Sequence, residues 1–180
     1  MDQSYLMIFY IASGLYTLLL CIAAALDTWK FIIPNAVTVG LMALFVVTTL
    51  LLPIEMGWRD WLSHLGAAGA VLTGGAVLFA FNKMGGGDVK LMTAVAFWTG
   101  FEYLADLLLY IALAGGALAI GLIVARKLLL GLMTARASLT KLSVPRILLS
   151  GEPVPYGLAI APSAIFLGTK LPQLGAEFWL

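Results

Sequence analysis

Met84-Gly85-Gly86-Gly87-Asp88-Val89-Lys90-Leu91 opens an apolar segment, 84–105, whose charge-free core covers only 91–101. At 1.5 Å per residue, a helix over that core is about 16 Å long, roughly half the thickness of a bilayer's hydrocarbon. The segment therefore crosses a membrane only if the charged residues that flank the core lie at the interface or inside it. Whether it crosses decides the number of membrane passages and with it the fold.

The composition indicates that lipid is the natural solvent of this protein. The chain has 180 residues, of which 62% are hydrophobic and only 11% are charged. A soluble domain carries about 25% charged residues, so a surface this poor in charge would not stay dissolved. Cys21 is the only cysteine, which excludes an internal disulfide and a Cys-based zinc site.

Apolar runs long enough to span the hydrocarbon of a bilayer recur along the whole chain. Together with the segment that follows the glycines, they predict six helices, with one longer loop before the last. No internal repeat and no linker marks a second folded unit, so residues 1–180 are expected to form a single membrane-embedded domain. The predicted helices cover about 5–26, 34–54, 61–82, 86–105, 107–125 and 154–171, and the predicted cytoplasmic loop covers 126–153.

The distribution of Lys and Arg supports six crossings. With six crossings and the N-terminus outside, eight of the ten Lys and Arg residues face the cytoplasm, a strong positive-inside bias. If 84–105 did not cross, four of the ten Lys and Arg residues would lie on one side of the membrane and six on the other, which is no bias. The sequence therefore predicts an all-α integral membrane protein with six transmembrane helices and its N-terminus outside. The predicted inner residues are Lys30, Lys83, Lys90, Arg126, Lys127, Arg136, Lys141 and Arg146, and the predicted outer ones are Arg59 and Lys170.

Two carboxylates fall on the same predicted side of the membrane. Asp27 ends the first predicted helix and Asp88 begins the fourth, so two crossings separate them whichever way the protein is oriented. An ordinary explanation remains open, in which each is an interfacial residue paired with a nearby lysine, Asp27 with Lys30 and Asp88 with Lys90. Two acids on one face weaken that explanation, because a carboxylate at membrane depth costs a few kcal/mol.

The backbone next to both carboxylates is irregular. The glycines of 85–87 expose N–H and C=O groups that lipid cannot satisfy. An extended peptide presented beside Asp88 would supply the missing hydrogen bonds, as in strand addition. After Asp27, Pro34 forces the preceding residue out of the helical region, so a turn separates the first two helices.

Two adjacent carboxylates can hydrolyse an amide without a metal or a covalent intermediate. They share a proton, because both cannot easily ionise together. The ionised carboxylate takes a proton from water, and the protonated one donates to the scissile carbonyl. Catalysis by a Ser or Cys nucleophile would need a histidine base, and His64 lies on the predicted outer side. Metal-dependent hydrolysis is not indicated either, since no HExxH or Cys/His metal pattern occurs. We therefore expect no metal and no cofactor, and the net charge of +1 gives no field for nucleic acid.

Three motifs resemble the type IV prepilin peptidases, a family of GxGD membrane aspartic proteases. Residues 85–88 fit GxGD, and the wider string 84–91 is similar to the family's motif. Asp27 with Ile33-Pro34-Asn35 is a second match, and Pro153-Val154-Pro155-Tyr156-Gly157-Leu158-Ala159-Ile160-Ala161 resembles the motif of the last helix. The resemblance implies the GxGD aspartic protease architecture with Asp27 and Asp88 as catalytic residues. The supporting residues that it implies are Gly85, Gly86, Gly87, Lys90, Pro34, Asn35, Pro155, Tyr156 and Gly157.

The resemblance also implies a substrate and a location. Members of the family cleave the leader peptide of prepilins at the cytoplasmic face of the bacterial inner membrane. The expected partners are thus a prepilin, with its leader and membrane helix, and the lipid bilayer. A single cysteine without paired CxxC motifs, and a start close to the first helix, make the chain similar to the short kind that serves tight-adherence (Flp) pili. N-methylation of the product is not expected.

Two other functions remain open. One is another GxGD protease, either a preflagellin peptidase or a presenilin-like enzyme, although the latter usually has a Tyr-Asp pair where Leu26 precedes Asp27 here. The other is a small proton or cation transporter that uses the two carboxylates as an ion site. An inverted repeat would favour the transporter, and the sequence shows none.

Overall fold

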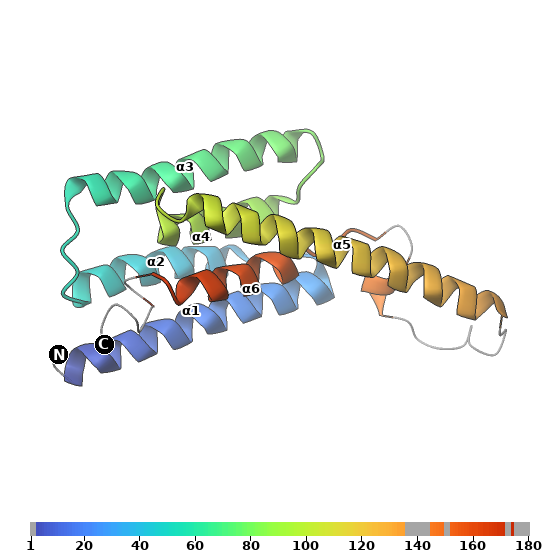
Figure 1. Ribbon diagram of the computed structural model, residues 1–180, viewed down its shortest axis with the longest axis horizontal. Helices are drawn as coiled ribbons and strands as arrows, with labels where there is room; N and C mark the ends of the chain where they lie inside the picture. The colour runs from blue at the N-terminus through green and yellow to red at the C-terminus, as the bar shows by residue number, and fades with distance from the viewer. Residues whose placement is uncertain (1–2, 136–144, 150–151, 172–173, 175–180) are drawn as a thin grey trace.

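The computed structural model describes residues 3–135, 145–149, 152–171 and 174, and every regular element among them is a helix (Figure 1). This confirms the prediction of an all-helical protein. Most of the helices lie side by side and form one bundle, with the start of α1 and the end of α6 toward the same end (Figure 1). In chain order the elements are α1 (Gln3–Lys30), α2 (Asn35–Leu51), α3 (Trp58–Ala80), α4 (Gly86–Thr99), α5 (Leu104–Ala135), the 3-10 helix η2 (Arg146–Leu148) and α6 (Gly157–Gly168).

Helix α4 forms the centre of the bundle. It packs against α2, α3, α5 and α6, and most of its side chains are buried. Helices α1 and α2 pack together, and α6 lies between α1 and α5. Because α4 is surrounded by protein, its polar first turn and its polar last turn can be satisfied by other helices rather than by lipid.

Aromatic side chains fill the core beside α4. The Trp98 ring is fully buried, 4.8 Å from the ring centre of Tyr16 and 5.2 Å from that of Phe45. Its Nε1–H donates a hydrogen bond to the backbone carbonyl of Leu41, 2.9 Å away. A buried tryptophan needs such a partner for its N–H. Trp98 therefore links α4 to α2 through this hydrogen bond and to α1 through packing of its ring against Tyr16.

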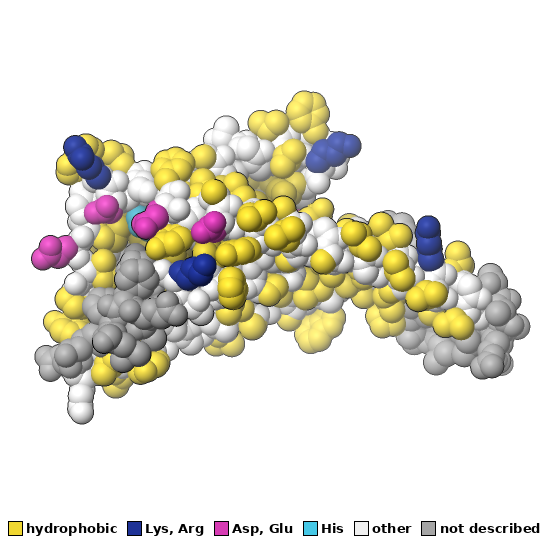
Figure 2. Space-filling model, in the orientation of Figure 1, with side chains coloured by type: hydrophobic (Ala, Val, Ile, Leu, Met, Phe, Trp, Pro, Cys, Tyr) yellow, Lys and Arg dark blue, Asp and Glu magenta, His cyan; other side chains and the backbone are white. Residues whose placement is uncertain are grey.

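The outer surface of the bundle is apolar. Large hydrophobic side chains such as Leu18, Leu50, Val77 and Ile120 are exposed, and yellow side chains cover most of the face in Figure 2. Exposed apolar area of this extent is unfavourable in water and favourable in a bilayer. Helices α1 and α3, and α5 over Leu104–Met133, are long and apolar enough to cross a membrane. The chain is therefore a membrane protein.

The remaining helices are shorter than a bilayer is thick. Helix α2 has 17 residues, α4 has 14 and α6 has 12. A 14-residue helix is about 21 Å long, against roughly 30 Å of hydrocarbon. A helix sheathed by its neighbours need not reach both surfaces, because its ends can lie at membrane depth inside protein.

Helix α4 ends earlier than the predicted helix 86–105. Its last residue is Thr99, and Gly100 follows with φ +59°, a conformation that favours glycine. The next N–H, of Phe101, donates to Oγ of Ser63 in α3 at 2.9 Å. The chain then reverses, and α5 begins at Leu104. A glycine that closes a helix and a side chain that captures the freed N–H explain the early end.

Helix α5 continues through Ala135, into the segment that was predicted as the loop 126–153. The residues from Arg126 to Met133 are mostly Leu, Lys and Arg, which are good helix formers. In Figure 1 this half of α5 projects beyond the ends of the other helices. Arg126 ties it to η2, because Nε and Nη2 donate to the carbonyl of Ile147 at 3.1 and 2.8 Å. Residues 136–144 and 150–151 of the predicted loop lie outside the described residues.

Replacing Trp98 with Phe is expected to lower the free energy of unfolding by about 1–3 kcal/mol. The change removes the donor to the Leu41 carbonyl and leaves part of a fully buried site empty. Thermal unfolding of the purified protein in detergent measures the effect. Trp29→Phe is the matched control, since Trp29 is 76% exposed. Equal melting temperatures for the two variants would contradict this account of the core.

Candidate active site

Asp27 lies in the last turn of α1, and its side chain is buried. The helix ends at Lys30. The next residue, Phe31, donates its backbone N–H to the carbonyl of Asp27 at 2.9 Å and has φ +53°. A bulky residue in this region is uncommon and strained. Pro34 then caps α2 in an extended conformation, with φ −64° and ψ 141°. The turn predicted between the first two helices is therefore present, and it begins one residue after α1.

Asp88 lies in the first turn of α4 and is also buried. Gly85 is the N-cap, and a Cβ on it would lie 2.8 Å from Oδ2 of Asp88. A Cβ on Gly87 would lie 3.3 Å from Cβ of Ile33, so this glycine lets the start of α4 approach the α1–α2 turn. The glycines thus have different tasks: Gly85 makes room for the carboxylate, and Gly87 allows two backbone segments to pack closely.

The start of α6 supplies a direct partner for Asp27. The backbone N–H of Gly157 donates to Oδ2 of Asp27 at 2.7 Å. A Cβ on Gly157 would lie 2.8 Å from the same oxygen and 3.2 Å from Cγ, which leaves no space for any other residue. The last motif of the sequence is therefore joined to the first by a hydrogen bond across 130 positions of the chain.

Two hollows meet at the carboxylates. The first, which we call the α2-side hollow, has a volume of about 470 Å³ and is bounded by 31–35, 85–88, Asp27 and Lys90. The second, the α6-side hollow, measures about 330 Å³ and is bounded by Asp27, Phe31, 82–85, Asp88, 153–154 and Tyr156. Asp27, Phe31, Gly85 and Asp88 line both. The structure thus places the two predicted carboxylates around the same two hollows.

Lys90 and Asn35 form a second polar contact at this site. Nζ of Lys90 donates to Oδ1 of Asn35 at 3.0 Å, which joins the first turns of α4 and α2. Among the described residues, Lys90 makes no ion pair with Asp88, and Lys30 makes none with Asp27. The ordinary explanation of two separate interfacial ion pairs is therefore not what the structure contains.

The other predicted residues take supporting positions. Pro155 is fully buried beneath the start of α6. The ring of Tyr156 forms part of the α6-side hollow and would lie 3.3 Å from a Cβ on Gly115 of α5. The sequence interpretation missed Phe31 and Gly115. Phe31 gave no signal of its own, since nothing in its residue type indicates a positive φ, but its place between Asp27 and Pro34 could have drawn attention to it.

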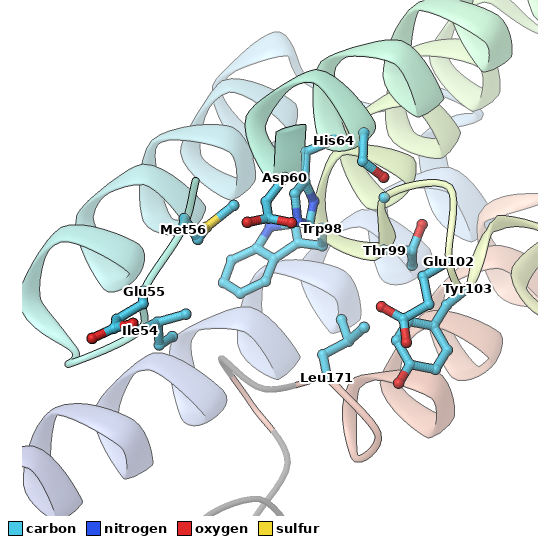
Figure 3. A pocket seen from close by; sticks show the side chains of 12 residues that line it. Ile54, Glu55, Met56, Asp60, His64, Trp98, Thr99, Glu102, Tyr103 and Leu171 are labelled. Carbon is cyan, nitrogen blue, oxygen red and sulfur yellow. The ribbon is translucent and has the colours of Figure 1, made fainter. Parts of the chain in front are cut away.

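A different hollow lies at the far end of α4, shown in Figure 3. It has a volume of about 240 Å³, and its lining includes Asp60, His64, Thr99 and Glu102. In Figure 3, Asp60 and His64 lie beside Trp98, and Glu102 lies on the other side of the hollow. Thr99 and Asp88 are at opposite ends of α4, so His64 cannot serve as a base for chemistry at the carboxylates.

Histidine 64 already has one fixed partner, since its Nδ1 forms a 2.8 Å hydrogen bond with the carbonyl of Phe97. Within the described part of the chain, no three His, Cys, Asp or Glu side chains are grouped so that they could hold a metal ion. The carboxylate pair is thus the grouping of ionisable side chains in that part that is best placed for hydrolytic chemistry.

The comparisons with known proteins identify one family. The model of the type IV leader peptidase family matches residues 14–120, which include Asp27, Pro34, Asn35 and the glycines before Asp88. The segment from Pro155 to Gly157 lies outside the matched residues. No curated protein and no solved structure matches the chain significantly. Because the family model covers more than half of the sequence, the chain belongs to the type IV leader peptidase family.

Proposed function

We propose that this protein is an aspartic endopeptidase of the bacterial inner membrane that removes the leader peptide of type IV prepilins of the Flp kind. The proposal rests above all on one observation, the shared position of Asp27 and Asp88 where two hollows meet. Membership of a leader peptidase family supports the reaction class. The substrate and the side of cleavage come from the motif resemblance and from the charge distribution.

The geometry suggests how the two carboxyl groups divide the chemistry. Oδ2 of Asp27 accepts the N–H of Gly157, which favours Oδ1 as the oxygen that carries a proton when Asp27 is protonated. In the proposed reaction the ionised carboxylate removes a proton from water as the water oxygen attacks the scissile carbonyl carbon. The protonated carboxyl group donates to the carbonyl oxygen. Collapse of the tetrahedral intermediate breaks the C–N bond, and a proton passes to the leaving amine.

The substrate backbone is proposed to run past the carboxylates in an extended form. The α2-side and α6-side hollows open on either side of the pair, which gives a peptide an entrance and an exit. Gly85, Gly86 and Gly87 line the α2-side hollow, so their backbone can face a second backbone that lies in it. The free N–H and C=O groups of an extended peptide can then pair with the chain, as in strand addition.

The proposed topology has six crossings with the N-terminus outside and the carboxylates near the cytoplasmic surface. In Figure 2, the visible Asp and Glu side chains lie near one end of the bundle, together with some Lys and Arg, and the charged side chains visible toward the opposite end are Lys and Arg. Such a bias places the basic end in the cytoplasm. Because α4 is only about 21 Å long, Asp88 at its start would lie below the headgroups, shielded by surrounding helices.

Asp27→Asn and Asp88→Asn should each abolish leader cleavage while the protein still inserts, because an asparagine can neither accept the water proton nor return it. The measurement is cleavage of a co-expressed Flp-type prepilin, read by sequencing its N-terminus. Asp106→Asn is the control, since Asp106 is exposed in the first turn of α5. Normal processing by either active-site variant would disprove the mechanism. Absence of cleavage by the wild type would favour the transporter or another protease.

Gly157→Ala should lower the catalytic rate by about 10- to 100-fold, the loss expected when a catalytic group is displaced by up to about 1 Å. The new methyl group would lie 2.8 Å from Oδ2 of Asp27 and would push the carboxylate away from its N–H partner. Rates are measured with purified enzyme in detergent. Gly14→Ala, with no atom within 4 Å of the new Cβ, should behave as wild type. A fully active Gly157→Ala enzyme would show that this contact does not position Asp27.

Membrane topology can be tested by cysteine labelling in a Cys21→Ser background. Cysteines at Thr28 and Pro145 should react from the cytoplasmic side, and a cysteine at Met56 from the other side. The reason is the parity of six crossings, which places the ends of α1 and α5 on one face. Labelling of Thr28 and Pro145 from opposite sides would overturn the six-crossing arrangement.

A further inference from the structure

A third hollow lies between α4 and α5, and we call it the α4–α5 groove. Its volume is about 390 Å³, and none of the described residues that line it is charged. Met84 and Met92 form one wall and Tyr156 one end. The rest is a face of α5 that runs from Leu108 to Ala119. A groove with this lining favours an apolar partner and offers no countercharge to a charged one.

The groove adjoins the proposed active site. Met84 and Tyr156 line both the α4–α5 groove and the α6-side hollow. Asp27 and Asp88 line that hollow, and both also line the α2-side hollow. The apolar groove thus adjoins the hollows at the two carboxylates, with Met84 and Tyr156 at the boundary.

The shape of the α5 face suits a helix as the occupant. The lining positions 108, 111, 112, 115, 116 and 119 recur every three or four residues, which places them on one stripe of α5. Near the middle of the stripe, Gly115 and Gly116 have no side chains, so the surface of α5 is indented there. A Cβ on Gly116 would meet no described atom within 4 Å. Small residues of this kind allow another helix backbone to approach closely in a membrane.

We propose that the α4–α5 groove docks the apolar membrane helix of the substrate, with the chain passing Tyr156 to reach the carboxylates and the leader leaving through the α2-side hollow. This inference rests on the proposed function, because it assumes a substrate whose cleavage site adjoins a membrane helix. Docking fixes the helix relative to Asp27 and Asp88, so the scissile bond is selected by its distance from the helix. It also explains how an enzyme with few polar side chains at its site can select one bond.

Gly116→Leu tests the groove, and Gly121→Leu is the matched control. Both glycines are in α5, and a Cβ on either meets nothing within 4 Å, so both variants can fold. Only Gly116 lines the groove. Gly116→Leu should raise KM for a membrane-inserted prepilin about tenfold with little change in kcat, the size of one helix–helix packing contact. Gly121→Leu should match wild type, and both variants should cleave a soluble leader peptide that lacks the helix at the wild-type rate.

A cross-linking experiment separates this inference from the proposed function. The enzyme carries Cys21→Ser, Asp88→Asn and Ala119→Cys, and single cysteines are placed along the membrane helix of the prepilin. Cross-links at helical spacing along the substrate would support docking even if the wild-type enzyme cleaved nothing. If the wild type cleaves, absence of these cross-links together with equal KM values for Gly116→Leu and Gly121→Leu would overturn docking and leave the groove to lipid. Cross-links between two enzyme copies, unaffected by added substrate, would overturn it in favour of a dimer.

Discussion

The hydrogen bond from the N–H of Gly157 to Oδ2 of Asp27 is the contact on which the arrangement of the site depends. Lipid offers no donor to a buried carboxylate, so the protein must supply one. The donor comes from the start of α6, and it fits only because position 157 has no Cβ. Through this bond the last helix is held against the end of the first, and Pro155 and Tyr156 are placed beside the carboxylates.

Helix α4 is the second constraint. Its start carries Asp88, and its end is closed by Gly100 against α3. Between them Trp98 connects it to α2 and to the aromatic side chains of the core. A short helix enclosed by four others can keep a carboxylate below the membrane surface, because protein rather than lipid surrounds it. In the proposed topology, the depth of the site in the membrane would follow from the length of α4.

Three hollows in sequence give the proposed enzyme a direction. The α4–α5 groove is apolar, the α6-side hollow holds the carboxylates together with polar backbone, and the α2-side hollow contains the Lys90–Asn35 contact. An apolar helix and a polar leader prefer opposite ends of this path. In the proposed reaction, differences in polarity between these adjoining hollows would orient a substrate without a dedicated binding domain.

The sequence by itself determined the helical membrane character of this protein, because scarcity of charge and long apolar runs allow little else in lipid. It also predicted that Asp27 and Asp88 lie on one side, because parity of crossings depends only on counting, and the structure has both residues around the same two hollows. Only the tertiary structure decided the contact with Gly157, the early end of α4 at Thr99 and the continuation of α5 to Ala135. These features depend on the packing of residues far apart in the chain, such as Ser63 with Phe101. Periodicity and composition depend on residues that are near one another in the sequence, so they do not predict which distant backbone group supplies a hydrogen bond.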